Sequence, residues 1–394
     1  MKRACLPIVA SLLMCWSAAA QDFRTGVMHP YPDNPGVETP VPAGYRPFYI
    51  SHFGRHGSRY HSSEKMIVPA LDGLMAAKNE GILTTSGEFL LQKGLEIQAA
   101  SSGMWGQLSD IGVEEHKTIA RRMIKRCPGV FKDSVRVLSS TFPRCILSMA
   151  ASTGEIQRLC PKTKWRFLVG KRYQSIVNTS LHPEGWVSGA SEQKKYLKEH
   201  LDQEKLLGVL FSDPTRGGEL IGSHSAFYKS LFAIWCGRSA IGLEPFDLDA
   251  ILGTDAVNVL ASSENLAHYR NMAVPIADSL ITDIVERADA AVKRSKPSAD
   301  LRYGHDNGLL RLLVQIGMDG YPRDLGVDQA AAFPFTDRVP LGANLQIVFY
   351  RNRKGNVLVK FLVNEKECAL TALPGGPYYA WEDVRSLFLE KSNR

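Results

Sequence analysis

A histidine stands between two arginines in the run Gly54-Arg55-His56-Gly57-Ser58-Arg59. Guanidinium groups match phosphate oxygens through paired hydrogen bonds. A histidine held among them can serve as a nucleophile or as a proton carrier. The run follows residues 47–53, an apolar segment typical of a buried strand. We therefore predict a phosphate-binding loop at this strand end, with His56 as its reactive group.

A second candidate segment lies at residues 139–144. Residues 134–139 are expected to form a strand, and Pro143 suits the first turn of the helix that follows. The N-terminus of a helix offers free N–H donors to an anion. Arg144 would be a third basic group there.

The third segment is Arg302-Tyr303-Gly304-His305-Asp306, between a predicted strand at 299–303 and a helix through 309–313. His305 is placed to contact a phosphate, and Asp306 to hold a proton. Asp306 fits equally well as a plain helix cap. In open α/β sheets such strand–loop–helix junctions meet at the carboxyl edge, where ligands bind. We therefore expect the three segments to form one site.

Other patterns predict the elements that must position this site. Helical periodicity occurs at residues 64–78 and 112–126, and a hairpin is expected from 344–350 and 357–363. Between about 165 and 295 the pattern becomes mostly helical, and residues 293–298 resemble a linker. We predict an α/β catalytic core from residues 21–160 and 296–394, with a mostly helical cap inserted at 161–295.

The chain resembles the histidine acid phosphatase family, and most closely the bacterial multiple inositol polyphosphate phosphatases and phytases. The resemblance rests on Arg55-His56-Gly57-x-Arg59, on His305-Asp306, and on Gly106-Gln107-Leu108-Ser109-x-x-Gly112-x-x-x-His116. It implies a phosphoglycerate-mutase-like core with a mixed or mostly parallel sheet flanked by helices, and an inserted cap. It also implies that His56 forms a phosphohistidine and that Asp306 protonates the leaving oxygen. The phosphate-binding residues that it implies are Arg55, Arg59, Arg144 and His305.

We expect no cofactor and no metal, since the arginines and His305 can supply the positive charge that metal ions give other phosphatases, and we expect a small phosphorylated partner such as inositol hexakisphosphate. Two positions depart from the resemblance: acid phosphatases of the family usually have Pro where this chain has His61, and inositol polyphosphate phosphatases usually have His-Ala-Glu at His305-Asp306. A broad acid phosphatase, a sugar-phosphate phosphatase and a non-enzymatic inositol phosphate binder therefore remain alternatives. Basic side chains of the cap that face the site would favour inositol hexakisphosphate, and the candidates are Lys171, Arg172, Lys194 and Lys195.

Other kinds of phosphatase fit the sequence less well. A zinc site built from His52, His56 and His61 would need the three to converge, whereas His52 lies within a predicted strand. A cysteine phosphatase would need a Cys and an Arg that bracket a phosphate loop, which no cysteine after residue 20 provides. Nucleic-acid binding has no supporting motif.

The first 20 residues have the features of a secretory signal. Lys2 and Arg3 precede a short apolar stretch, and Ala18-Ala19-Ala20 suits cleavage. We expect a secreted or periplasmic protein that begins at Gln21, with a lipoprotein anchored at Cys15 as the less favoured alternative. Cleavage removes two basic residues and changes the net charge from +7 to +5. No later stretch is long and apolar enough to span a bilayer.

Overall fold

The computed structural model describes residues 23–178, 188–294 and 298–392, so the predicted signal segment lies outside the described residues. Within these ranges one sheet has the strand order β3-β2-β4-β1-β5-β6-β7, with β8 paired to β6. Its strands are β1 (Arg46–Arg55), β2 (Ser134–Ser139), β3 (Lys164–Val169), β4 (Ser298–Gly304), β5 (Asn344–Arg351), β6 (Val357–Val363), β7 (Lys366–Glu367) and β8 (Tyr379–Ala380).

The sheet is parallel on one side of β1 and antiparallel on the other. The neighbouring strands β3, β2, β4 and β1 run parallel, whereas β5 pairs antiparallel with both β1 and β6. The central strand β1 is buried on both faces, as its mostly apolar sequence predicts. The predicted fold class, a mixed sheet flanked by helices, is confirmed.

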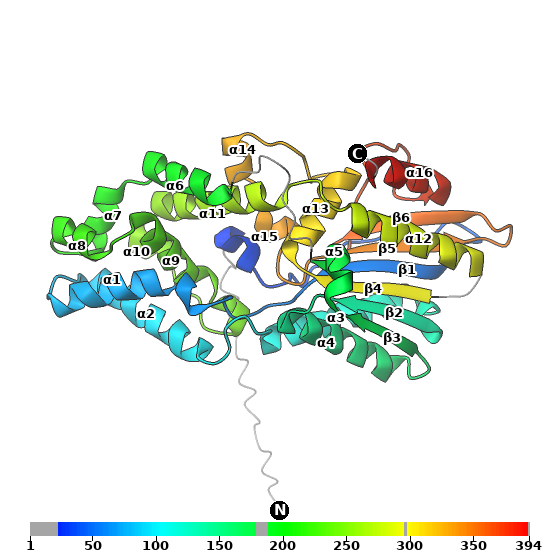
Figure 1. Ribbon diagram of the computed structural model, residues 1–394, viewed down its shortest axis with the longest axis horizontal. Coiled ribbons are helices and arrows are strands. Elements are labelled where there is room, and N and C mark those ends of the chain that lie inside the picture. Colours follow the sequence, from blue (N-terminus) through cyan, green and yellow to red (C-terminus); the bar gives the residue numbers. More distant parts are fainter. Residues whose placement is uncertain (1–22, 179–187, 295–297, 393–394) are drawn as a thin grey trace, which may run out of the picture.

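Helices cover both faces of this sheet (Figure 1). Met123 of α3 and Met149 of α4 pack with Ile50 of β1 on one face. On the other face, helices α12 and α13 contact β1, and α16 contacts β6 and β8; Tyr49 and Phe53 of β1 belong to the apolar core on this face. The sheet-covering helices are α3 (Asp110–Arg126), α4 (Pro143–Leu159), α12 (Asp278–Arg294), α13 (Asp306–Ile316) and α16 (Trp381–Ser392).

A second, helical region lies beside the sheet, on the left of Figure 1. Its helices are α1 (Val68–Asn79), α2 (Thr85–Ser101), α6 (Gly189–His200), α7 (Gln203–Leu210), α8 (Pro214–Leu220), α9 (His224–Cys236), α10 (Leu248–Leu252) and α11 (Thr254–Met272). Helices α1 and α2 both pack on α9, so a segment that precedes the predicted cap contributes to the helical region.

Two elements within the predicted cap range lie with the sheet instead. Strand β3 pairs with β2 along its whole length, and α12 packs against α16 and β1. The exact division of the chain into core and cap stays a prediction, but these contacts assign β3 and α12 to the sheet region. The sequence did not predict β3, an edge strand whose side chains are mostly exposed and whose position is set by its pairing with β2.

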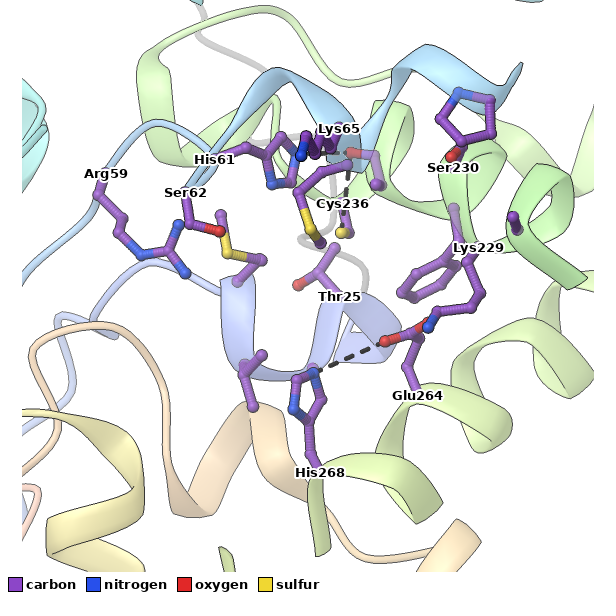
Figure 2. A pocket seen from close by; sticks show the side chains of 18 residues that line it. Thr25, Arg59, His61, Ser62, Lys65, Lys229, Ser230, Cys236, Glu264 and His268 are labelled. Carbon is purple, nitrogen blue, oxygen red and sulfur yellow. Dashed lines mark hydrogen bonds and ion pairs between the residues drawn. The ribbon is translucent and has the colours of Figure 1, made fainter. Parts of the chain in front are cut away.

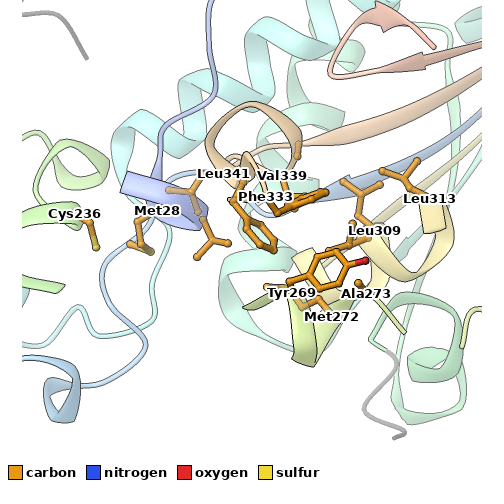
Figure 3. Packing of buried hydrophobic residues seen from close by; sticks show 14 of the residues in the cluster. Met28, Cys236, Tyr269, Met272, Ala273, Leu309, Leu313, Phe333, Val339 and Leu341 are labelled. Carbon is orange, nitrogen blue, oxygen red and sulfur yellow. The ribbon is translucent and has the colours of Figure 1, made fainter. Parts of the chain in front are cut away.

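Several short elements complete the described chain. They are α5 (Gln174–Val177), α14 (Val327–Ala331), α15 (Phe335–Arg338) and the 3₁₀ turns η1 (Phe23–Met28), η2 (Glu64–Met66), η3 (Val130–Lys132), η4 (Lys171–Tyr173) and η5 (Ser239–Ile241). Figure 3 shows one apolar cluster that runs from Leu309 of α13 through Phe333 to Tyr269 of α11. This shared core holds the helical region against the carboxyl edge of the parallel strands. No helix among the described residues is long and apolar enough to cross a bilayer.

Candidate active site

The three predicted segments converge at one edge of the sheet. Strands β1, β4 and β2 are parallel neighbours, so their carboxyl ends lie together. The His56 N–H donates to the Gly304 carbonyl over 3.0 Å, and the Ser140 N–H donates to the Tyr303 carbonyl over 2.9 Å. Backbone hydrogen bonds therefore join the loop after β1 to the loops after β4 and β2.

The ring of His56 is buried and held by its own loop. Its Nδ1 lies 3.0 Å from the Gly57 carbonyl oxygen, and since a carbonyl only accepts, Nδ1 carries the hydrogen. Its Nε2 then has a lone pair and no hydrogen-bond partner among the described residues. Burial, followed by the charges of Arg55 and Arg59, holds the pKa of His56 well below its ordinary value. The ring is therefore neutral, which is the state that a nitrogen nucleophile requires.

Arg55 is fully buried at the end of β1 and fixed in one orientation. Its Nη1 donates to the carbonyls of Val27 and Val339, both at 2.8 Å. Its Nη2 lies 2.8 Å from Oδ2 of Asp306. Burial lowers the pKa of Arg55, and the nearby Asp306 charge opposes that effect. Arg55 thus ties η1 and the segment after α15 to the N-terminus of α13.

Arg59 and Arg144 carry positive charge that is only partly satisfied. Each has a buried Nε with no hydrogen-bond partner among the described residues. Burial and the charges of Arg144 and Arg55 lower the pKa of Arg59 to about 9. The Arg144 guanidinium lies over the Phe142 ring, 4.7 Å from its centroid. Unpaired donors among like charges are the arrangement that a bound anion relieves.

A chain of hydrogen bonds fixes the tautomer of His305. Nη2 of Arg144 lies 3.4 Å from Nδ1 of His305, which must accept because an arginine only donates. His305 Nε2–H then donates to Ser140 Oγ at 3.0 Å, and Ser140 donates to Oε1 of Gln174 at 3.3 Å. Burial and the Arg144 charge lower the pKa of His305 to about 4. Gln174, on α5, was not among the predicted site residues.

Asp306 occupies the first turn of α13, directly after its N-cap, His305. Its Oδ1 accepts from the Asn307 N–H at 2.9 Å, while Oδ2 pairs with Arg55. Burial alone would raise the pKa of Asp306, but Arg55 and the other positive groups outweigh burial and hold the pKa well below its usual range. Asp306 is therefore ionised in the unliganded protein, and it both stabilises the helix start and balances Arg55.

A cavity of about 230 Å³ opens beside Arg59, between the loop after β1 and helices α9 and α11. Figure 2 shows Lys65, Lys229, Glu264 and His268 around it. His268 Nε2 lies 3.7 Å from Oε2 of Glu264. The cavity thus extends from the edge of the arginine cluster into the helical region, while His56 itself is not part of its lining.

The four candidate basic residues of the cap, Lys171, Arg172, Lys194 and Lys195, are exposed and do not line this cavity. The cavity's lysines come instead from η2 and α9. Their positions depend on how these elements pack, which spacing along the chain does not reveal.

The three histidines weighed as a metal site do not converge. The His52 ring is buried against Tyr303, and His61 Nε2 donates to the Ala233 carbonyl at 2.9 Å. No cluster of three metal-ligating side chains occurs in the ranges that the structure describes. The five cysteines after residue 20 are all described and all free.

No protein-family model and no curated protein matches the sequence. Solved structures do match. A Bifidobacterium longum multiple inositol polyphosphate phosphatase in complex with inositol hexasulfate superposes with a TM-score of 0.76 at 15% identity, over 93% of this chain and 97% of that one. A phytase from D. castellii gives 0.72 at 16% identity, over 94% and 85%. A Hafnia alvei phytase in complex with myo-inositol hexakis sulphate gives 0.55 at 13% identity, over 89% and 98%.

These matches span almost the whole chain and include both the sheet and the helical region. The resemblance predicted from three short motifs is therefore confirmed at the level of the fold: the chain has the fold of these phosphatases and phytases.

Proposed function

We propose that the protein is a phosphomonoester hydrolase that acts through a covalent phosphohistidine at His56, most favourably on inositol polyphosphates. One observation carries this proposal. A neutral histidine with a free Nε2 lies among three arginines, each of which has a buried Nε with no hydrogen-bond partner among the described residues. A dianionic phosphate would satisfy those donors, and its phosphorus would then face the lone pair of Nε2.

The reaction requires two displacements. Nε2 of His56 forms a bond to phosphorus as the ester P–O bond breaks, and the leaving oxygen takes a proton from Asp306. Water then attacks the phosphorus of the phosphohistidine and gives its proton to the Asp306 carboxylate. The P–N bond breaks, so inorganic phosphate is released and neutral His56 is restored. The arginines stabilise the charge on the phosphoryl oxygens in both steps.

Asp306 must be protonated for the first step, although it is ionised in the unliganded protein. A bound phosphate offsets the positive charge of Arg55 and Arg59, two of the groups that hold the Asp306 pKa down. Burial then acts without that opposition and raises the pKa. Substrate binding therefore prepares the acid that the reaction needs.

The cavity beside Arg59 supports an inositol polyphosphate as substrate. Lys65 and Lys229 lie around it, where they can meet phosphates other than the one that is cleaved. Two of the proteins with this fold were solved with inositol hexasulfate or myo-inositol hexakis sulphate, anions dense in charge. Glu264 and the apolar Met28 and Phe232 in the same lining favour the alternative, a sugar monophosphate.

Turnover by the purified protein distinguishes an inositol polyphosphate from a sugar monophosphate as the preferred substrate. We expect a higher kcat/KM for inositol hexakisphosphate than for glucose 1-phosphate, and a reversed order would assign a sugar-phosphate phosphatase.

His56→Ala should lose at least about 10³-fold in kcat while it stays folded. Rapid quenching with labelled substrate should trap a base-stable phosphoprotein in the wild type but not in the variant. Binding of inositol hexakisphosphate without turnover would instead indicate a binding protein.

We also propose that the chain is exported and cleaved before Gln21, on the basis of its first 20 residues. N-terminal sequencing of protein recovered from the periplasm or medium tests this, and a lipid-modified Cys15 would overturn it.

A further inference from the structure

The peptide unit between Gly57 and Ser58 connects the proposed nucleophile to a buried carboxylate. Its carbonyl oxygen accepts from His56 Nδ1–H at 3.0 Å. Its N–H, on Ser58, donates to Oε2 of Glu115 at 2.7 Å. Because the carbonyl and the N–H belong to one rigid plane, fixing one end fixes the other.

Glu115 holds this peptide from α3. It also accepts from Ser58 Oγ at 2.6 Å and from the Tyr31 N–H at 2.8 Å, so three donors meet one carboxylate. Glu115 is only 9% exposed. A buried carboxylate with three donors has little freedom to move, and it fixes the backbone that donates to it.

The loop passes very close to α3 at this point. A Cβ on Gly57 would lie 2.7 Å from the Gly112 carbonyl oxygen and 2.9 Å from Oε2 of Glu115. A Cβ on Gly112 would lie 2.2 Å from the Ser58 carbonyl oxygen. Two glycines thus let the loop and the helix approach closely enough for Glu115 to reach the peptide.

The other peptide units around His56 have neutral partners. The Gly57 N–H donates to Ser148 Oγ at 3.1 Å, and the His56 carbonyl accepts from the Gly342 N–H at 2.9 Å. Glu115 is the ionisable partner in this set. A carboxylate on the N–H side makes the Gly57 carbonyl a stronger acceptor, since hydrogen bonds in series polarise one another.

We propose that Glu115 is a positioning residue for the nucleophile, which acts through the Gly57–Ser58 peptide. It keeps the hydrogen of His56 on Nδ1 and therefore keeps the lone pair on Nε2, towards the phosphate. A catalytic triad uses a carboxylate in direct contact with its histidine for this purpose, whereas here one peptide bond lies between them. The inference rests on the proposed role of His56.

Burial raises the pKa of Glu115 to about 7. A protonated Glu115 can donate from Oε1 to Ser58 Oγ and still accept the Ser58 N–H at Oε2. The positioning contact therefore persists on both sides of that pH.

A graded series of variants tests the role. Glu115→Ala leaves the Ser58 N–H without its acceptor and should lower kcat about 10–100-fold, the usual cost of losing such an outer partner. KM should change less than threefold, because the arginines are untouched. Glu115→Gln keeps one oxygen for the Ser58 N–H and should recover part of the loss. The matched control is Glu114→Ala, one residue away, whose side chain is 61% exposed and pairs with Lys117; its kcat should stay within twofold.

Nitrogen-15 NMR of labelled histidine reads the tautomer directly and needs no turnover. We expect His56 to be protonated at Nδ1 in the wild type and in Glu114→Ala, and to become a mixture of tautomers in Glu115→Ala. A wild-type His56 protonated at Nε2, or a folded Glu115→Ala with unchanged tautomer and unchanged kcat, overturns the inference. The NMR result stands even if the protein proves to be a binding protein, so failure of the proposed function and failure of this role are distinguishable.

Discussion

Replacing Asp306 by Asn removes two things at once: the proton donor of the proposed reaction and the charge that balances Arg55. The amide has nearly the same shape as the carboxyl group, and its oxygen can still accept from the Asn307 N–H. Its NH₂ group then faces Nη2 of Arg55, where Oδ2 stood 2.8 Å away. The variant therefore removes the acidic proton of Asp306 but keeps its hydrogen bond at the start of α13.

The catalytic consequence depends on the leaving group. An inositol or sugar alkoxide needs a proton as the P–O bond breaks, and a positioned acid typically contributes about 10²–10⁴-fold. p-Nitrophenolate leaves without that help. We expect kcat of Asp306→Asn to fall by this factor on inositol hexakisphosphate and by less than about tenfold on p-nitrophenyl phosphate. Equal losses on both substrates would refute the acid assignment and leave Asp306 with a binding or structural role.

The electrostatic consequence appears in stability. Breaking a buried ion pair costs about 3–5 kcal/mol, but the Asp306 side chain is 23% exposed, so we expect about 1–3 kcal/mol after discounting for solvent screening. The folded pKa of Asp306 is depressed. Its contribution is therefore present above the unfolded pKa of ~3.9 and is lost as the pH falls towards the folded value. Urea unfolding should show the gap between wild type and variant at pH 7 and a smaller gap near pH 3.5; a gap that is constant with pH would contradict the pairing.

Two other predictions concern the metal and the loop. Activity should survive dialysis against a strong chelator, because arginines supply the positive charge at the phosphate; loss on chelation with rescue by zinc or magnesium would show a metal requirement. Gly57→Ala should lower the free energy of unfolding by about 1–3 kcal/mol, since its Cβ meets the α3 backbone at Gly112. The control is Gly154→Ala, in α4 with open space around it, which should raise the free energy of unfolding by about 0.5–1 kcal/mol. Urea unfolding measures both variants. A Gly57→Ala protein as stable as the control would contradict the close contact between Gly57 and Gly112.

The sequence predicted the elements whose signal is local. β1 was recognisable because a strand buried on both faces is mostly apolar along its length. The convergence of the loops at His56, Ser140 and His305 followed from the geometry of parallel strands, since their carboxyl ends must share one edge. Strand β3 was not recognisable, because an edge strand with exposed side chains is defined by its backbone pairing.

The residues that hold the candidate catalytic groups were harder to predict. Gln174 reaches His305 through Ser140 only because α5 packs near the end of β4. Glu115 lies in a predicted amphipathic helix, where a glutamate normally faces solvent. Its one sequence signal is the three-residue spacing from Gly112, which places both on one helix face. That face is the contact with the loop, which periodicity alone does not reveal.

Charge balance explains why Asp306 is ionised in the empty site and why its pKa should rise when a phosphate binds. Three arginines and the Asp306 carboxylate give a net charge of +2 around a neutral His56 and a neutral His305. A phosphate dianion cancels that excess. The excess charge is also what keeps Asp306 ionised against its burial, so its removal shifts the Asp306 pKa upward. The contact with Arg55 that keeps Asp306 deprotonated in the empty site therefore makes its pKa respond to the ligand, and in the proposed reaction Asp306 holds a proton only when a phosphate ester is bound to receive it.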